Sequence, residues 1–120
     1  MELNFMKWCD KSEKVLKWNS EEVIIPYISP IDNKRHRYYP DFLIQTKEGW
    51  VLIEVKPLVQ TKPPKKLLIE NLTPKKKRRY ALAVKTWLIN DAKWKAAIKA
   101  CEVKGWRFQL MTEKQLQPDK

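Results

Sequence analysis

The chain has 120 residues, 43% of them hydrophobic, and 25 Lys and Arg against 14 acidic residues give a net charge of +11. This length fits one domain, residues 1–120, with a core that needs no disulfide bonds or metal ions to be stable. No apolar run approaches the roughly 20 residues that span a bilayer, and no leader is evident, so we expect neither a membrane nor an exported protein. Cys9 and Cys101 are too few for a disulfide framework and predict buried, reduced thiols in an intracellular protein.

The excess of positive charge is typical of proteins that contact nucleic acid, because lysine and arginine displace counterions from phosphates. An anionic membrane surface and an acidic protein partner are the two alternatives. No strongly amphipathic terminal helix supports the membrane alternative. Charge therefore favours nucleic acid as the partner.

The first elements expected along the chain are a helix and a strand. Apolar residues at helical spacing predict a helix over residues 2–18, which Asn19 and Ser20 would end. β-branched residues predict a strand over residues 22–28, in which Pro26 indicates an edge position or a bulge.

A turn-forming segment, residues 29–34, is followed by two further predicted strands. These cover residues 37–45 and 50–55, with a tight connection over residues 46–49. The strand over residues 50–55 is almost entirely apolar, which predicts a central position covered on both faces.

The second half of the chain begins with an irregular segment. Residues 58–79 contain three prolines and two basic runs and predict a mobile basic loop with at most one short helix. Helical periodicity then covers residues 80–101, where Asn90 and Asp91 could cap a second helix, and Gly105 is the expected C-cap. A strand over residues 106–111 and a short turn complete the chain.

The expected order of elements is therefore α-β-β-β-α-β. Three antiparallel strands followed by a helical crossover to a further strand predict an α/β fold with a mixed central sheet flanked by helices.

Two carboxylates and one lysine meet on the predicted hairpin. Asp41 lies directly opposite Glu54 if the connection has four residues, and it becomes a diagonal neighbour if the connection has three. Both registers keep the carboxylates within reach of one metal ion, since cross-strand neighbours are about 4.5–8 Å apart. Glu54 and Lys56 project from the same face, whereas Val55 between them points into the core.

Such a group can hydrolyse a phosphodiester. Mg²⁺ favours carboxylates together with water and phosphate oxygens, and it can activate a bound water. Lys56 would neutralise developing charge or orient the nucleophile. The alternative is a surface salt bridge, in which acidic and basic side chains on strands pair without any catalytic role.

Pro40-Asp41 followed by Glu54-x-Lys56 resembles the PD-(D/E)xK nuclease superfamily, whose core has the same α-β-β-β-α-β order and a restriction-endonuclease-like fold. A longer ordered set of motifs resembles the head completion nucleases of contractile-tailed phages and, more distantly, the TnsA-type transposon endonucleases. The motifs are residues 2–10, 20–30, 37–42, 53–57 and 84–87.

This resemblance implies a role for each motif residue. Asp41 and Glu54 would be metal ligands, Lys56 the catalytic lysine, and Glu2 the glutamate that the family carries on its first helix and that completes the metal shell. A glutamate in a first helical turn can also merely complement the helix dipole, which is the alternative for Glu2. The implied cofactor is Mg²⁺, for which Mn²⁺ substitutes.

The candidate DNA contacts come after Lys56 in the chain, and most of them are basic residues that we expect to be exposed. They are Gln60, Lys62, Lys65, Lys66, Lys75, Lys76, Lys77, Arg78, Arg79 and Lys85. A solvated charged surface is the alternative for the basic residues, and a loop polar residue is the alternative for Gln60. His36, the single histidine, is expected to be a polar residue at a strand entry.

These observations predict a Mg²⁺-dependent DNA endonuclease. The resemblance implies action on phage DNA ends during head completion, in the host cytoplasm or the virion, with capsid or portal proteins as partners. A non-catalytic DNA-binding module with a nuclease-like fold and a structural head protein are the two alternatives.

Overall fold

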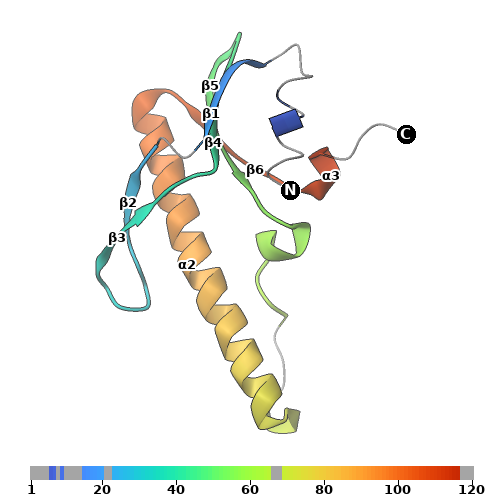
Figure 1. The fold of residues 1–120 in the computed structure, drawn as a ribbon. Helices are drawn as coiled ribbons and strands as arrows, with labels where there is room; N and C mark the ends of the chain where they lie inside the picture. The colour runs from blue at the N-terminus through green and yellow to red at the C-terminus, as the bar shows by residue number, and fades with distance from the viewer. Residues whose placement is uncertain (1–5, 8, 10–14, 21–22, 66–68, 117–120) are drawn as a thin grey trace.

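The computed structural model describes residues 6–7, 9, 15–20, 23–65 and 69–116. Its centre is a mixed four-stranded sheet in the order β1-β4-β5-β6 (Figure 1). The strands are β1 (Val15–Ser20), β4 (Phe42–Thr46), β5 (Gly49–Val55) and β6 (Arg107–Met111). The first three are antiparallel, and β6 runs parallel to β5. The predicted mixed sheet and the central position of β5 are thus confirmed.

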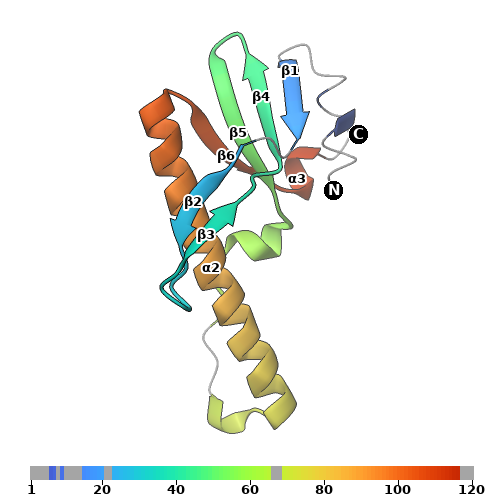
Figure 2. The same cartoon turned by 60° about the vertical axis from the view of Figure 1, so that its left-hand side comes forward.

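A second, two-stranded sheet is separate from the first. Its strands are β2 (Ile25–Ile28) and β3 (Arg35–Tyr38), and this hairpin lies beside the long helix (Figure 2). The prediction of one strand over residues 37–45 is wrong, because the chain leaves β3 at Tyr38 and enters the other sheet at Phe42. Pro40, which lacks an N–H to donate to a ladder, lies in that interruption.

The predicted meander is therefore wrong in its first strand, and β1 takes that place next to β4. The predicted helix over residues 2–18 is also wrong at its end, where residues 15–18 belong to β1. A register shift between Val15 and Lys17 lets Val15 and Trp18 pack against the same core cluster. The stripe of helical spacing that predicted the helix extended to Leu16, which belongs to β1.

The helix α2 (Pro74–Lys104) is continuous for 31 residues, about 46 Å at 1.5 Å per residue. Pro74 occupies its first turn, where a missing N–H has no effect, and Thr73 caps it by accepting a hydrogen bond from Lys76 N. The expected basic loop is therefore helical from residue 74 onward. The expected break at residues 90–91 is absent, and Asp91 pairs with Lys95 within the continuous helix.

The end of α2 agrees with the prediction. Gly105 adopts a left-handed backbone, with φ of 73°, and its N–H caps the last carbonyl groups of the helix. The short elements are η1 (Leu58–Thr61), η2 (Ile69–Asn71) and α3 (Glu113–Leu116). No helix within the described ranges is both long and apolar enough to span a membrane.

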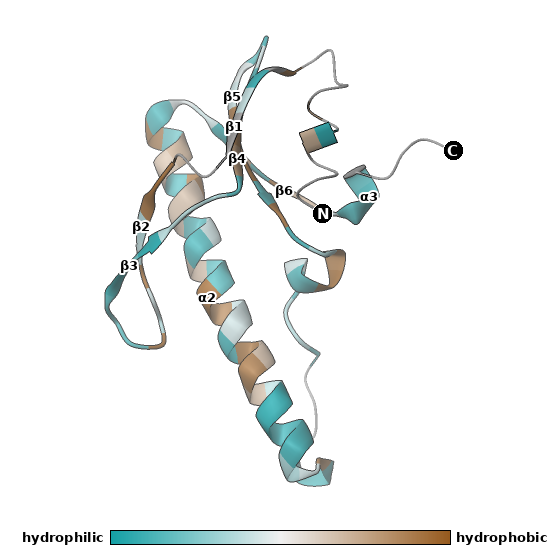
Figure 3. Ribbon diagram, viewed as in Figure 1, coloured by the Kyte–Doolittle hydropathy of each residue, from teal (hydrophilic) through white to brown (hydrophobic). Residues whose placement is uncertain are grey.

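Both faces of the sheet are packed, and the apolar strands stand out in Figure 3. One face gathers alternate β5 residues, among them Val51 and Val55, with Cys9 from the N-terminal segment. The other face places Leu52 against Trp94 and Ala97 of α2 and the β2–β3 hairpin. Cys9 and Cys101 are both buried, as predicted.

Leu52 links the sheet, the helix and the hairpin, and its side chain is 1% exposed. We expect Leu52→Ala to lower the free energy of unfolding by about 2–5 kcal/mol, because it leaves a cavity between packed layers. Urea denaturation measures the decrease. The matched control is Val103→Ala on α2, where Val103 is 84% exposed and the change should stay within about 0.5 kcal/mol.

Candidate functional site

The turn between β4 and β5 fixes which residues face each other. Thr46 pairs with Gly49 and Gln45 with Trp50, so only Lys47 and Glu48 lie outside the ladder. Thr46 Oγ1 donates to Gly49 O (3.0 Å) and accepts from Glu48 N (3.2 Å), while Gly49 takes a φ of 129° that favours glycine. Of the two registers left open by the sequence, this is the one that places Asp41 opposite Glu54.

The carboxylate of Asp41 is tied to the neighbouring strand. Asp41 directly precedes β4, whose first residue Phe42 pairs with Ile53. Its Oδ2 accepts a hydrogen bond from Val55 N at 2.8 Å. The side chain therefore spans the gap between the strands and lies beside Glu54.

Glu54 is buried, with only 5% of its surface exposed. Its Oε2 accepts a hydrogen bond from the hydroxyl group of Tyr38, which is itself 3% exposed. Burial raises the pKa of Glu54 to about 8, and the hydrogen bond that its carboxyl group shares with Asp41 acts in the same direction. Burial and the nearby Glu54 carboxylate likewise raise the pKa of Tyr38.

Tyr38 is a site residue to which the sequence analysis assigned no role. It is the last residue of β3 and comes from the separate hairpin, 16 positions before Glu54. The Nζ atom of Lys93 lies 5.6 Å from the Tyr38 ring and 5.9 Å from the Tyr27 ring, so this lysine packs over tyrosines. The one available signal was a tyrosine close to Asp41, which does not distinguish a buried partner from a surface aromatic residue.

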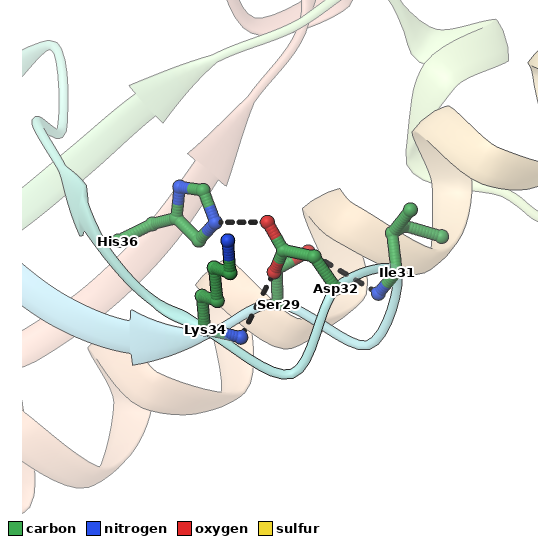
Figure 4. A network of polar contacts seen from close by, with 5 residues as sticks. All are labelled: Ser29, Ile31, Asp32, Lys34 and His36. Carbon is green, nitrogen blue, oxygen red and sulfur yellow. Dashed lines mark hydrogen bonds and ion pairs between the residues drawn. The ribbon is translucent and has the colours of Figure 1, made fainter.

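A polar network closes the hairpin that carries Tyr38 (Figure 4). Asp32 accepts hydrogen bonds from Lys34 N (2.9 Å) and pairs with His36 Nε2 (2.8 Å), and Ile31 N donates to Ser29 Oγ (3.3 Å). The hydrogen bond from the Lys34 N–H lowers the pKa of Asp32 most, and the hydrogen bond with His36 lowers it further. His36 thus lies on β3 as a polar partner of the turn, consistent with the predicted role.

Lys56 follows the last residue of β5 and is half-buried. Its N–H donates to Met111 O at 2.9 Å, which extends the ladder to β6 beyond the end of β5. The ammonium group is near enough to Glu54 to oppose the rise of its pKa. The structure therefore brings Asp41, Glu54 and Lys56 together, with Tyr38 as a fourth member.

The donor set fits a hard divalent cation. The buried Glu54 and the half-buried Asp41 repel each other when both are ionised, and a cation between them removes that repulsion. Glu2, expected as a third ligand, lies outside the described residues. Within those residues, no three acidic, cysteine or histidine side chains converge into a metal-binding cluster.

The candidate DNA contacts occupy two neighbouring segments. Gln60 lies in η1, and Lys62 and Lys65 follow it; all three are exposed. The basic run at residues 75–79 forms the exposed, hydrophilic start of α2 (Figure 3), and Lys85 is exposed further along it. Lys66 lies outside the described residues. The ion pairs found among the described residues involve none of these side chains.

A mixed sheet flanked by helices, with an acidic pair where β4 and β5 meet, is consistent with a restriction-endonuclease-like fold. The sequence profile of the family described as TnsA-like endonuclease N terminal matches residues 12–113, a range that includes Asp41, Glu54 and Lys56. The chain therefore belongs to this family.

One relative is the head completion nuclease of Enterobacteria phage T4. It is 36% identical over 110 residues, which cover 91% of this chain and 72% of the relative. No solved structure shows a significant match.

The raised pKa of Glu54 predicts a pH-dependent stability. The carboxyl group keeps its proton up to a pKa of about 8 when folded but ionises above 4.5 in the unfolded chain, so unfolding releases a proton between these values. In metal-free protein this contribution to the free energy of unfolding should fall as pH rises, by at most about 1.4 kcal/mol per pH unit. Urea denaturation in EDTA at several pH values measures the slope.

Glu54→Gln should remove this contribution, because the amide does not titrate. Glu102→Gln, an exposed position on α2, is the matched control and should keep the slope. Equal slopes in the wild-type and Glu54→Gln proteins would contradict the raised pKa.

Proposed function

We propose that this protein is a metal-dependent DNA endonuclease of the PD-(D/E)xK type, with Mg²⁺ as its natural ion and Mn²⁺ as a substitute. The observation that carries the proposal is the buried Glu54, held by Tyr38 and facing Asp41, with Lys56 at the end of the same strand. A buried glutamate beside a second carboxylate has little value for stability, whereas metal-assisted hydrolysis uses such a pair. Family membership supports the same reaction class.

Asp41 and Glu54 would hold the ion through carboxylate oxygens. When bound, the ion would polarise a phosphate oxygen and lower the pKa of a coordinated water. Glu54 would release its proton as the ion binds, and the hydroxyl group of Tyr38 would keep its carboxylate oriented. Lys56 would hold an oxygen of the scissile phosphate and stabilise the negative charge that develops there.

The relative from phage T4 is named a head completion nuclease. By this likeness, the substrate of the present chain would be phage DNA, with its ends as the site of action during head completion. Capsid or portal proteins would then be its partners.

A second candidate function is DNA binding without catalysis, within the phage head or during its assembly. The specific observation in its favour is the run of five exposed cations at the start of α2, which would contact phosphates even if the acidic pair were inert. Cleavage assays separate the two functions.

We expect purified protein to cleave plasmid DNA with Mg²⁺ or Mn²⁺ and to be inactive in EDTA. Asp41→Ala and Lys56→Ala should each lower the rate by at least about 100-fold, because each removes a group that acts in the transition state. Gel electrophoresis of the plasmid forms measures the rate. Lys99→Ala, an exposed lysine of α2 outside the site, should cleave at the wild-type rate. Cleavage that persists in the Asp41→Ala and Lys56→Ala proteins would contradict the assigned site.

The start of α2 should dominate the salt dependence of DNA binding. The double substitution Lys76→Gln/Arg78→Gln should weaken binding and reduce the slope of log K against log salt by about 0.9 for each phosphate that the protein no longer neutralises. Fluorescence anisotropy in EDTA measures both quantities. The matched control, Lys47→Gln/Lys99→Gln, removes the same charge from other exposed positions. An equal change in both double variants would show that only net charge matters.

A further inference from the structure

A groove of about 410 Å³ lies between the segment that follows Lys56 and the N-terminal half of α2. This volume is within the range of pockets that bind small ligands, about 300–1,000 Å³. Apolar side chains line most of it, among them Val59, Leu82 and Trp87. Val59 and Leu82 are largely exposed, so the described residues leave these apolar surfaces uncovered.

Asn90 lines the same groove and is unusual in its surroundings. Its side chain is only 8% exposed, yet its amide makes no hydrogen bond with the described residues. The amide lines the groove, where water or a ligand can complete the hydrogen bonds that no described residue supplies. Such a group in a groove indicates a ligand with a hydrogen-bonding edge, because an amide offers both a donor and an acceptor.

The rim of the groove supplies positive charge. Lys62 lies on the η1 side and Arg79 on the α2 side, and neither pairs with an acidic side chain among the described residues. A ligand that fits this arrangement has a flat apolar face for Trp87, a polar edge for Asn90 and a negative charge nearby. A nucleotide combines these three properties.

The α2 wall of the groove is connected to the acidic pair through packed side chains. Asn90 lies one turn, about 6 Å along the axis, before Trp94. Trp94 packs in one cluster with Tyr38, and Tyr38 donates its hydrogen bond to Glu54. The opposite wall begins three residues after Lys56, at Val59, directly after Leu58, whose N–H donates to Glu113 Oε2 at 2.9 Å. One wall of the groove is therefore formed by the segment that directly follows Lys56.

We propose that this groove binds one unpaired nucleotide of the DNA substrate, with its base against Trp87 and its edge on Asn90. In a duplex the faces and the pairing edges of each base are already occupied, so only an unpaired nucleotide can use both contacts. This inference rests on the proposed function, because it says which kind of DNA the acidic pair would cleave.

The test compares two short DNA duplexes, one blunt and one with a single unpaired nucleotide at its end, in EDTA so that no cleavage interferes. Wild-type protein should bind the second duplex about tenfold more tightly, the effect of stacking one base. Asn90→Leu and Arg79→Gln should each reduce this preference by about three- to tenfold. Lys99→Gln is the matched control for Arg79→Gln and should leave the preference unchanged.

Asn90→Leu also has a stability readout. Leucine is close in size to asparagine and removes the unpaired amide, so the unfolding temperature should hold or rise while the preference disappears. A lower unfolding temperature would assign Asn90 a structural role and overturn the inference. Self-association of the wild-type protein that Asn90→Leu abolishes would overturn it too, since a second copy would then be the occupant.

The outcomes distinguish this inference from the proposed function. If the protein cleaves plasmid with Mg²⁺ but binds both duplexes equally, the proposed role of the groove is overturned and the proposed nuclease function stands. A preference that Asn90→Leu removes would support the groove even if no cleavage were detected.

Discussion

The register of the β4–β5 hairpin is the constraint on which the candidate site depends. Side chains alternate between the two faces of a strand, so a shift of one residue would place Asp41 and Glu54 on opposite faces. The expectation that the register with a three-residue connection would also bring the two carboxylates together therefore does not hold. The short turn at Lys47 and Glu48 sets this register, and the bond from Val55 N to Asp41 holds it at the other end. The fold can hold the buried Glu54 beside the half-buried Asp41 because a hydroxyl donor reaches one oxygen of Glu54 and a backbone N–H reaches one oxygen of Asp41.

Local sequence predicted the parts of the fold that local physics decides. The apolar run before Glu54 identified the central strand, and Gly49 and Gly105 identified a turn and a helix end. β1 was missed because Val15 and Trp18 pack on one face only through an irregular register with β4, a strand that follows much later in the chain. The start of α2 was missed because proline and five successive cations usually indicate a loop, whereas Thr73 caps the helix there.

The site, like the fold, was predictable where it depends on residues close together in the sequence. Asp41, Glu54 and Lys56 lie within one hairpin, so spacing alone brings them together. Tyr38 and Asn90 depend on contacts between elements: Tyr38 reaches Glu54 from a second sheet, and Asn90 lines a groove whose other wall is the segment from Val59 to Pro64. No periodicity in the sequence encodes these approaches, because each depends on how separate elements pack.

The composition of the first turn of α2 has an electrostatic consequence for the free protein. The N-terminus of a helix carries a partial positive charge, which neighbouring cations make less favourable. Residues 75–79 add five cations there, and no acidic residue lies in the first turn. This end of the helix is therefore under electrostatic repulsion that a polyanion relieves. A polyanion bound at this end of α2 would therefore raise the local stability of the helix, and high salt, which screens the repulsion, would raise it too.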